Sequence, residues 1–237
     1  MKSKTLNALT GFLCAPALLC LCLCVHGCAA GPVSDPGKTL SFPEEWTRGG
    51  RQTAAGDAIR KASGEIHGRT AREKIRGVME YVWGTFSYDP WYKTEAFTKT
   101  AEELFQGRVL SGCSDYALVE IALFRALGIP CRMVITCNVD WIHMYRMDGL
   151  SLSEGHSFVE VYLDGRWHLV DTTYRWLFNG YDPAHPFYPH GEVFCRRGVD
   201  FWDMGLRSMQ DLDRMLKDKA ADYPGGYEEP GYPKHPL

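Results

Sequence analysis

The sequence lacks an excess of charge of either sign. It holds 26 Lys and Arg against 29 Asp and Glu, a formal net charge of −3 at pH 7. Because the phosphates of nucleic acid attract clustered Lys and Arg, this balance argues against a nucleic-acid partner. Internal repeats are also missing, and so is the Asp pattern of an EF-hand calcium loop. With 237 residues, 45% of them hydrophobic, the chain can form one globular domain with a full core, or a domain with appendages.

Metal-ligand spacings are missing as well. Nine cysteines are present, but most lie in the first 28 residues, and the others are Cys113, Cys131, Cys137 and Cys195. These four form no CxxC or Cys/His pattern, so we predict no zinc site, no other metal and no cofactor. Cys131 and Cys137 lie about 20 Å apart if the chain between them is extended, too far for a disulfide. Either of them could pair with Cys195 in an oxidising compartment.

The N-terminus has the pattern of an export signal. Two lysines precede an apolar run over residues 6–25, which small residues follow. The sequence Val25-His26-Gly27-Cys28 resembles a bacterial lipobox, so we predict a signal peptide over residues 1–28 and a membrane anchor on lipidated Cys28. An ordinary signal peptide cut after Ala30 and a retained transmembrane anchor stay open. All three place the domain outside the cytoplasm: at the cell envelope as a lipoprotein, or otherwise periplasmic or secreted.

Composition divides the rest of the chain into three parts. Residues 29–51 carry prolines and a Gly-Gly pair, which predicts a tether or an irregular lead-in. Residues 52–200 form the expected domain. Residues 201–237 are expected to hold a helix that begins near Ser208, followed by a poorly ordered tail rich in Pro, Gly and Tyr.

Helix starts are well marked. Capping boxes occur at Thr70–Glu73 and Thr100–Glu103, where a hydroxyl and a carboxylate satisfy first-turn amides. Another helix begins near Cys113 and ends at Gly128-Ile129-Pro130, the expected ending for a helix. Its apolar face is broad, which predicts a central, largely buried helix.

Strand patterns dominate the second half of the domain. A strand is predicted over residues 131–139, followed by a loop or irregular insertion over residues 140–154. Residues 157–163 and 166–172 are predicted to form a hairpin across Asp164-Gly165, after which order is expected to weaken. Helices first and antiparallel strands second give an α+β class.

The hairpin turn sets a register with chemical consequences. If Asp164 and Gly165 are the turn residues, Leu163 pairs with Arg166. Side chains alternate along a strand, so His156 and Asp171 then become diagonal neighbours on one face. A slip of one residue would separate them.

Together with Cys113, this arrangement predicts a thiol nucleophile, a base and a group that orients the base. Cys113 lies at a helix start, where unpaired amides and the helix dipole favour a thiolate. His156 can take the thiol proton, and Asp171 can fix the imidazole ring. Attack on a carbonyl would give a thioester, with the Cys113 amide as first oxyanion donor. Tyr88 and Trp91 are weak candidates for the second donor.

Four motifs in this order resemble the transglutaminase-like superfamily. They are Gly112–Ala117, Ala126–Arg132, Gly155–Tyr162 and Trp167–Thr173. The resemblance spans about residues 70 to 175 and implies a papain-like core with a central Cys-bearing helix on an antiparallel sheet. It also implies a Cys113, His156, Asp171 triad of the kind used in peptidases, protein cross-linkers and glycan amidases. Phe158 stands where many relatives carry Trp.

These observations predict an exported, cysteine-dependent amide hydrolase that works through a thioester. The simplest substrate is a peptide or protein, or a glycopeptide. One alternative is acyl transfer to an amine, as in protein cross-linking. Another is a cell-surface module that binds a peptide or glycan without catalysis.

Other polar and aromatic residues have structural explanations. Asp115 falls in the first turn of the Cys113 helix, where a carboxylate favours the dipole. His185 and His190 flank prolines without ligand spacing and are expected on a surface loop. Five aromatic residues could line a cleft, although a satellite core is favoured. They are Trp141, Tyr145, Trp176, Phe178 and Tyr181.

Overall fold

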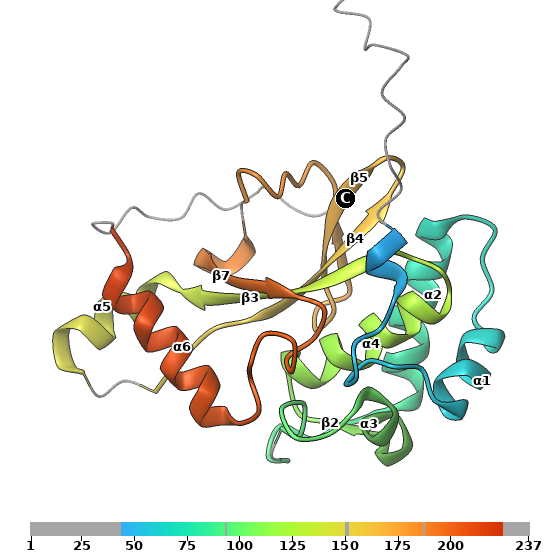
Figure 1. Cartoon of the computed structure of the whole chain (residues 1–237), viewed down its shortest axis with the longest axis horizontal. Helices are drawn as coiled ribbons and strands as arrows, with labels where there is room; N and C mark the ends of the chain where they lie inside the picture. The colour runs from blue at the N-terminus through green and yellow to red at the C-terminus, as the bar shows by residue number, and fades with distance from the viewer. Residues whose placement is uncertain (1–43, 93, 150–151, 187, 225–237) are drawn as a thin grey trace, which may run out of the picture. The chain divides into compact units, whose positions relative to one another are not determined.

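A computed structural model describes residues 44–92, 94–149, 152–186 and 188–224, all within one compact unit (Figure 1). The predicted signal peptide, Cys28 and the tail after residue 224 lie outside these described residues. Within them, no helix is long and apolar enough to cross a membrane. The same segments contain no group of three or more His, Cys, Asp or Glu side chains arranged to hold a metal ion.

Helices make up the first half of the unit. After a short 3₁₀ turn (η1, Glu44–Thr47) come α1 (Asp57–Glu65), α2 (Ala71–Thr85), α3 (Ala101–Gly107) and α4 (Cys113–Ala126). Both predicted capping boxes are confirmed: the Thr70 hydroxyl accepts from the Glu73 amide, and the Thr100 hydroxyl from the Glu103 amide. In each box the glutamate side chain bonds back to the cap amide, which satisfies a second first-turn donor.

A five-stranded antiparallel sheet follows, with strand order β6-β5-β4-β3-β7. Its strands are β3 (Cys131–Asn138), β4 (Ser157–Leu163), β5 (Arg166–Asp171), β6 (Trp176–Phe178) and β7 (Glu192–Gly198). Two further short strands, β1 (Ser87–Tyr88) and β2 (Val109–Leu110), pair in parallel within the helical half. The α+β class is therefore confirmed.

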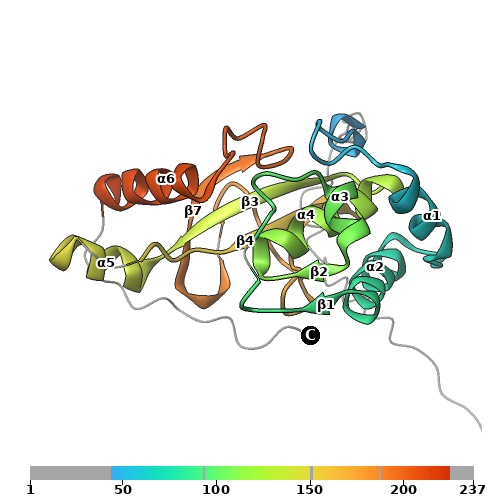
Figure 2. The ribbon, with the colours of Figure 1, turned by 90° about the horizontal axis from the view of Figure 1, so that it is seen from below.

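Helix α4 is the centre of the fold, as its broad apolar face predicts. Every side chain from Asp115 to Arg125 is buried. Helices α1, α2 and α3 pack against α4, which also packs against β3 and β4, so that α4 lies between helices and sheet (Figure 2). The main hydrophobic core fills this face of the sheet. A smaller cluster covers the opposite face, built from Val134, Phe158, Leu169 and Tyr188.

The segment predicted as a loop over residues 140–154 is mostly helical, so that prediction is wrong. Helix α5 (Val139–Asp148) begins where the Asn138 side chain accepts a hydrogen bond from the Trp141 amide. It ends at Gly149, which has a φ of 67°, the left-handed conformation that glycine adopts without strain. Both cap residues were visible in the sequence, but the helix buries Trp141 rather than a regular apolar stripe.

The expectation of weak order after Asp171 is also wrong, because β6 and β7 complete the sheet. Strand β7 pairs with β3 through a β-bulge between Ile135 and Thr136. Most side chains of β7 are half-buried on both faces, so its sequence lacks the alternation of apolar and polar residues that predicts a strand. Helix α6 (Met209–Asp222) begins at Ser208 as predicted and contacts both α5 and β7 (Figure 1).

The four cysteines in the described segments are all free thiols. Cys131 faces the helix side of the sheet, with its sulfur 3.6 Å from the carbonyl oxygen of Ile121. The thiol of Cys137 is hydrogen-bonded with that of Cys195, and this bond together with burial raises the pKa of Cys137. Of the two possible partners for Cys195, the fold therefore places Cys137 beside it.

Candidate active site

The β4–β5 hairpin has the register that the turn residues predict. Asp164 and Gly165 both have positive φ, 52° and 79°, as a tight hairpin turn requires. Leu163 pairs with Arg166, and the ladder continues inward from there. At its open end Nε2 of His156 lies 3.1 Å from Oδ2 of Asp171. The two side chains thus meet as diagonal neighbours, as the register requires.

Asp171 is held from both of its oxygens. Oδ1 accepts hydrogen bonds from the amides of Thr173 and Tyr174, at 3.0 and 3.2 Å, while Oδ2 faces His156. The carboxylate is fully buried. Because backbone amides fix its position, it can orient the imidazole without moving itself.

Cys113 is the first residue of α4, directly after the cap residue Gly112. The first hydrogen bond within the helix runs from the Tyr116 amide to the Gly112 carbonyl. The amides of Cys113 and Ser114 therefore have no acceptor inside the helix and point from its positive end. This environment favours negative charge on the sulfur and on a nearby oxyanion.

Cys113 and His156 shift each other's ionisation. Burial alone would raise the pKa of the Cys113 thiol, but the hydrogen bond and charge of His156 outweigh it and the net pKa is lowered. Burial would likewise lower the pKa of His156, yet its hydrogen bonds with Asp171 and Cys113 raise it well above 6.5. Since Asp171 occupies Nε2, Nδ1 is the nitrogen left for the thiol proton. The pair favours a thiolate beside an imidazolium.

His190 also reaches this site, which overturns its expected place on a surface loop. Its Nε2 lies 3.7 Å from Oδ2 of Asp171, and its ring stacks on Trp176 with centroids 5.7 Å apart. Burial lowers the pKa of His190, against the opposing charge of Asp171. No sequence signal marks this position, because only the pairing of β7 with β3 brings it here. His185, by contrast, is exposed as expected.

Glu192 and Glu120 are further carboxyl groups that sequence patterns did not reveal. Burial raises the pKa of Glu192, at the start of β7, to about 7. Glu120 lies in α4, two turns beyond Cys113, and neither of its buried oxygens has a hydrogen-bond partner. Burial first, and then the charge of Asp171, raise the pKa of Glu120 well above 4.5, which favours its neutral form. A second buried carboxyl group therefore lies near the Asp171 carboxylate.

Asp115 has the structural role that its place in the first helical turn predicts. It is buried, and its two oxygens accept from the Thr94 hydroxyl, the Ala96 amide, and the amide and hydroxyl of Ser111. These bonds tie the loop before α3 to the segment before α4. They fix the chain on both sides of the pocket next to Cys113.

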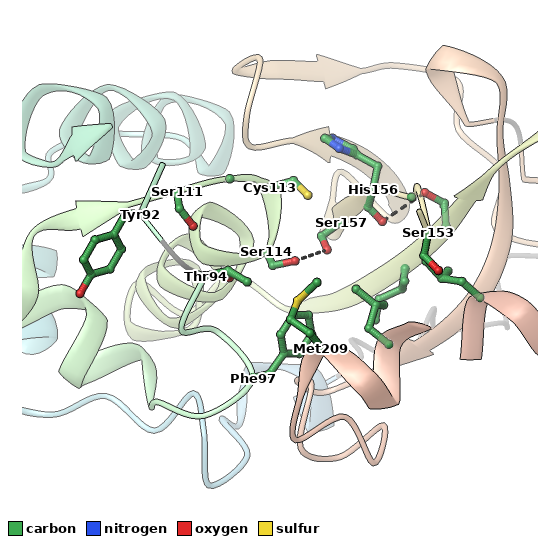
Figure 3. A pocket seen from close by; sticks show the side chains of 16 residues that line it. Tyr92, Thr94, Phe97, Ser111, Cys113, Ser114, Ser153, His156, Ser157 and Met209 are labelled. Atoms are coloured by element: carbon green, nitrogen blue, oxygen red, sulfur yellow. Dashed lines mark hydrogen bonds between the residues drawn. The ribbon is translucent and has the colours of Figure 1, made fainter. Parts of the chain in front are cut away.

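A pocket of about 310 Å³ opens beside Cys113 and His156 (Figure 3). Tyr88 and Trp91, the candidates for a second oxyanion donor, do not line it, and Trp91 is 94% exposed.

The predicted satellite core is confirmed for Phe178 and Tyr181, which pack on the smaller cluster. Trp141 instead belongs to the main core, with Tyr145 packed against that core.

Comparison with known proteins identifies a family for the middle segment of the chain. Residues 60–172 match the model of the transglutaminase-like superfamily, and this segment contains Cys113, His156 and Asp171. This segment therefore has the sequence pattern of the transglutaminase-like superfamily, as its motifs indicate. No curated protein matches the sequence.

Three solved structures are similar to parts of this chain at low sequence identity. A candidate cysteine protease from Cytophaga hutchinsonii is 20% identical with a TM-score of 0.49, and the match covers 68% of this chain and 48% of that one. A structure described as a TGase is 19% identical with a TM-score of 0.34, covering 48% and 30%. A candidate protease from Parabacteroides distasonis is 11% identical with a TM-score of 0.38, covering 60% and 26%. The chain thus spans less than half the length of each.

Proposed function

We propose that the protein is a cysteine-dependent amide hydrolase that acts on a peptide, protein or glycopeptide. The observation that carries the proposal is the connected series of Cys113, His156 and Asp171, in which the thiol pKa is lowered and the imidazole pKa is raised. A structural cysteine has no need of a base and an orienting carboxylate. The same series satisfies the geometric requirements for a nucleophile, a base and an orienter.

The reaction follows from the positions of these groups. The Cys113 thiolate attacks the amide carbon, and the oxyanion that forms accepts a hydrogen bond from the Cys113 amide. Nδ1 of the His156 imidazolium gives its proton to the departing amine, which leaves a thioester on the sulfur. His156, now neutral, takes a proton from water, and the resulting hydroxide releases the acid and restores the thiolate. Asp171 supports the positive charge of the ring throughout.

The main test compares cysteine variants in one hydrolysis assay. Cys113→Ala should reduce turnover of a labelled peptide library by at least about 10³-fold, because it removes the attacking atom. Mass spectrometry after acid quenching should find the thioester on wild type and not on Cys113→Ala. Cys195→Ala is the matched control, since Cys195 is also a partly exposed thiol but lies outside the pocket. Unchanged turnover in Cys113→Ala would sink the proposal.

Two further assays separate hydrolysis from its alternatives. A glutamine-containing protein and a labelled primary amine report transfer, since covalent amine incorporation appears only if an amine takes the acyl group. Iodoacetamide labelling against pH reports thiol activation, which a binding module lacks. His156→Ala should raise the labelling pKa of Cys113, because it removes the largest contributions that oppose burial of the thiol. His185→Ala should leave it unchanged.

Export and membrane attachment form a separate part of the proposal. The N-terminal pattern of lysines, apolar run and lipobox-like sequence supports lipidation of Cys28 and a location at the cell envelope. Expression in a bacterium grown with an alkyne-tagged fatty acid should label the full-length protein and leave Cys28→Ala unlabelled. Equal labelling of the two proteins would refute attachment through Cys28.

A further inference from the structure

The pocket beside Cys113 has an apolar floor that is built partly from the C-terminal helix. Phe97, Ile135 and Leu216 line it and are each at most 2% exposed. Leu212 and Met209 stand nearer the surface, and Met209 is 44% exposed. The residues Met209, Leu212 and Leu216 follow one face of α6. Helix α6 lies outside residues 60–172, the segment that matches the family model.

The polar groups in the wall are engaged with the protein itself. Among the described residues that line the pocket, none is Lys, Arg, Asp or Glu. The hydroxyls of Thr94 and Ser111 donate to Asp115, that of Thr136 donates to the His156 carbonyl, and that of Ser153 donates to Asp213. Ser114 and Ser157 share a hydrogen bond with each other. Away from the first turn of α4, a charged or strongly polar ligand group would therefore lose its hydration and find few partners to replace it.

The size of the pocket suits one side chain with its own backbone. A cavity of about 150 Å³ lined by Leu, Ile and Phe already holds benzene, so 310 Å³ accommodates a Leu, Met or Phe side chain. In Figure 3 the His156 ring lies on one side of the Cys113 sulfur, and Phe97 and Met209 lie on the other. Because the departing amine takes its proton from His156, the apolar side receives the acyl part of the substrate.

We propose that this pocket selects an apolar residue on the acyl side of the bond that Cys113 attacks, and that α6 sets this selectivity. The inference rests on the proposed function for the reaction itself. It adds the substrate class, a peptide with a Leu, Met or Phe residue at the cleaved carbonyl, and it makes Leu212 and Met209 specificity-determining residues.

Chloromethyl ketones test the pocket without requiring turnover. The thiolate forms a carbon–sulfur bond and expels chloride, so mass spectrometry of the alkylated Cys113 peptide gives the rate. N-acetyl-leucine and N-acetyl-asparagine chloromethyl ketones have side chains of similar shape and opposite polarity. Wild type should react on the order of 10-fold faster with the leucine reagent, because an isobutyl group gains from burial. The ratio of the two rates cancels any general change in thiol reactivity.

Variants of α6 locate the source of the preference. Leu212→Asp and Met209→Asp should each bring the ratio to about threefold or less, since a carboxylate in the pocket wall disfavours an apolar neighbour. Gln210→Asp is the matched control on the exposed side of the same helix and should keep the wild-type ratio. Met209→Asp also guards against misfolding, because Met209 is exposed.

The outcomes separate this inference from the proposed function. A wild-type ratio near one, or a ratio unchanged in both Leu212→Asp and Met209→Asp, would overturn the apolar subsite. If His156→Ala alkylates as fast as wild type while the leucine preference persists, the subsite stands and the activated nucleophile is refuted. A leucine preference lost in the two α6 variants and kept in Gln210→Asp supports the inference.

Discussion

In the β4–β5 hairpin the residues that form the candidate site are close in sequence, whereas the segment after it reaches the same site from far along the chain. His156 and Asp171 are 15 residues apart and meet through one tight turn. Ser153 and Asp213, which join the pocket wall to α6, are 60 residues apart. Short-range pairing therefore holds His156 and Asp171 together, and long-range packing builds the pocket walls beside them. Reaction and selectivity should then be separable by mutation.

The largest effect is expected from a change at Asp171, in the β4–β5 hairpin. Asp171→Asn keeps the shape of the side chain but removes the charge that supports the His156 imidazolium. Turnover should fall by roughly 10²- to 10⁴-fold, the scale seen when a triad carboxylate is neutralised. Steady-state kinetics on the peptide library measure the loss, and thermal unfolding should show a folded protein. Wild-type turnover in a folded Asp171→Asn protein would contradict the role assigned to Asp171.

A second change breaks the connection between the two regions. Glu160 of β4 is buried and bonded to Arg132, to Tyr181 and to Arg197 of β7. Glu160→Gln leaves two arginines without their carboxylate, and we expect a loss of about 3 kcal/mol in the free energy of unfolding. Urea denaturation measures it. Asp182→Asn is the control, because it removes an exposed pair with His185 and should change the free energy of unfolding by less than about 0.5 kcal/mol. Equal losses in Glu160→Gln and Asp182→Asn would contradict a stabilising role for the buried network.

A third, smaller effect concerns the unpartnered carboxyl in α4. The folded-state pKa of Glu120 is raised, so its contribution to stability is present below pH 4.5 and is lost as pH rises through the folded pKa. Glu120→Gln should remove this loss and increase stability at pH 8 by about 1 kcal/mol, with little change at pH 4. Denaturation at both pH values tests this, with exposed Glu80→Gln as control. An equal change at pH 4 and pH 8 would argue against a titrating Glu120.

The smallest effect is expected from a change at His190, in the segment that follows the β4–β5 hairpin. His190→Phe keeps an aromatic ring beside Trp176 but removes the nitrogen that faces Asp171. Hydrolysis at pH 7 should fall by no more than about fivefold, because this nitrogen lies 3.7 Å from Oδ2 and acts on Asp171 electrostatically rather than through a hydrogen bond. Because the pKa of His190 is lowered, its proton is taken up only at acid pH, and the acid limb of the pH–rate profile should lose this ionisation. His185→Phe should reproduce the wild-type profile; an identical profile for His190→Phe would exclude a positioning role.

Local patterns predicted the reactive part of the fold well. The capping boxes at Thr70 and Thr100, the ending of α4 and the Asp164-Gly165 turn each depend on a few neighbouring residues, and all are confirmed. Helix α5 was missed although its caps, Asn138 and Gly149, are local signals. The helix buries Trp141 but has no regular apolar stripe, and such a stripe is the main sequence signal for a helix.

The sequence by itself determined the α+β class, the family motifs and the register that joins His156 to Asp171, since turn chemistry and side-chain alternation act over a few residues. Only the tertiary structure decided that β7 pairs with β3, that His190 reaches Asp171, and that α6 lines the pocket beside Cys113. These contacts join segments far apart in the chain. They form because burying shared apolar surface outweighs weak local preference, and that balance is set by the whole fold.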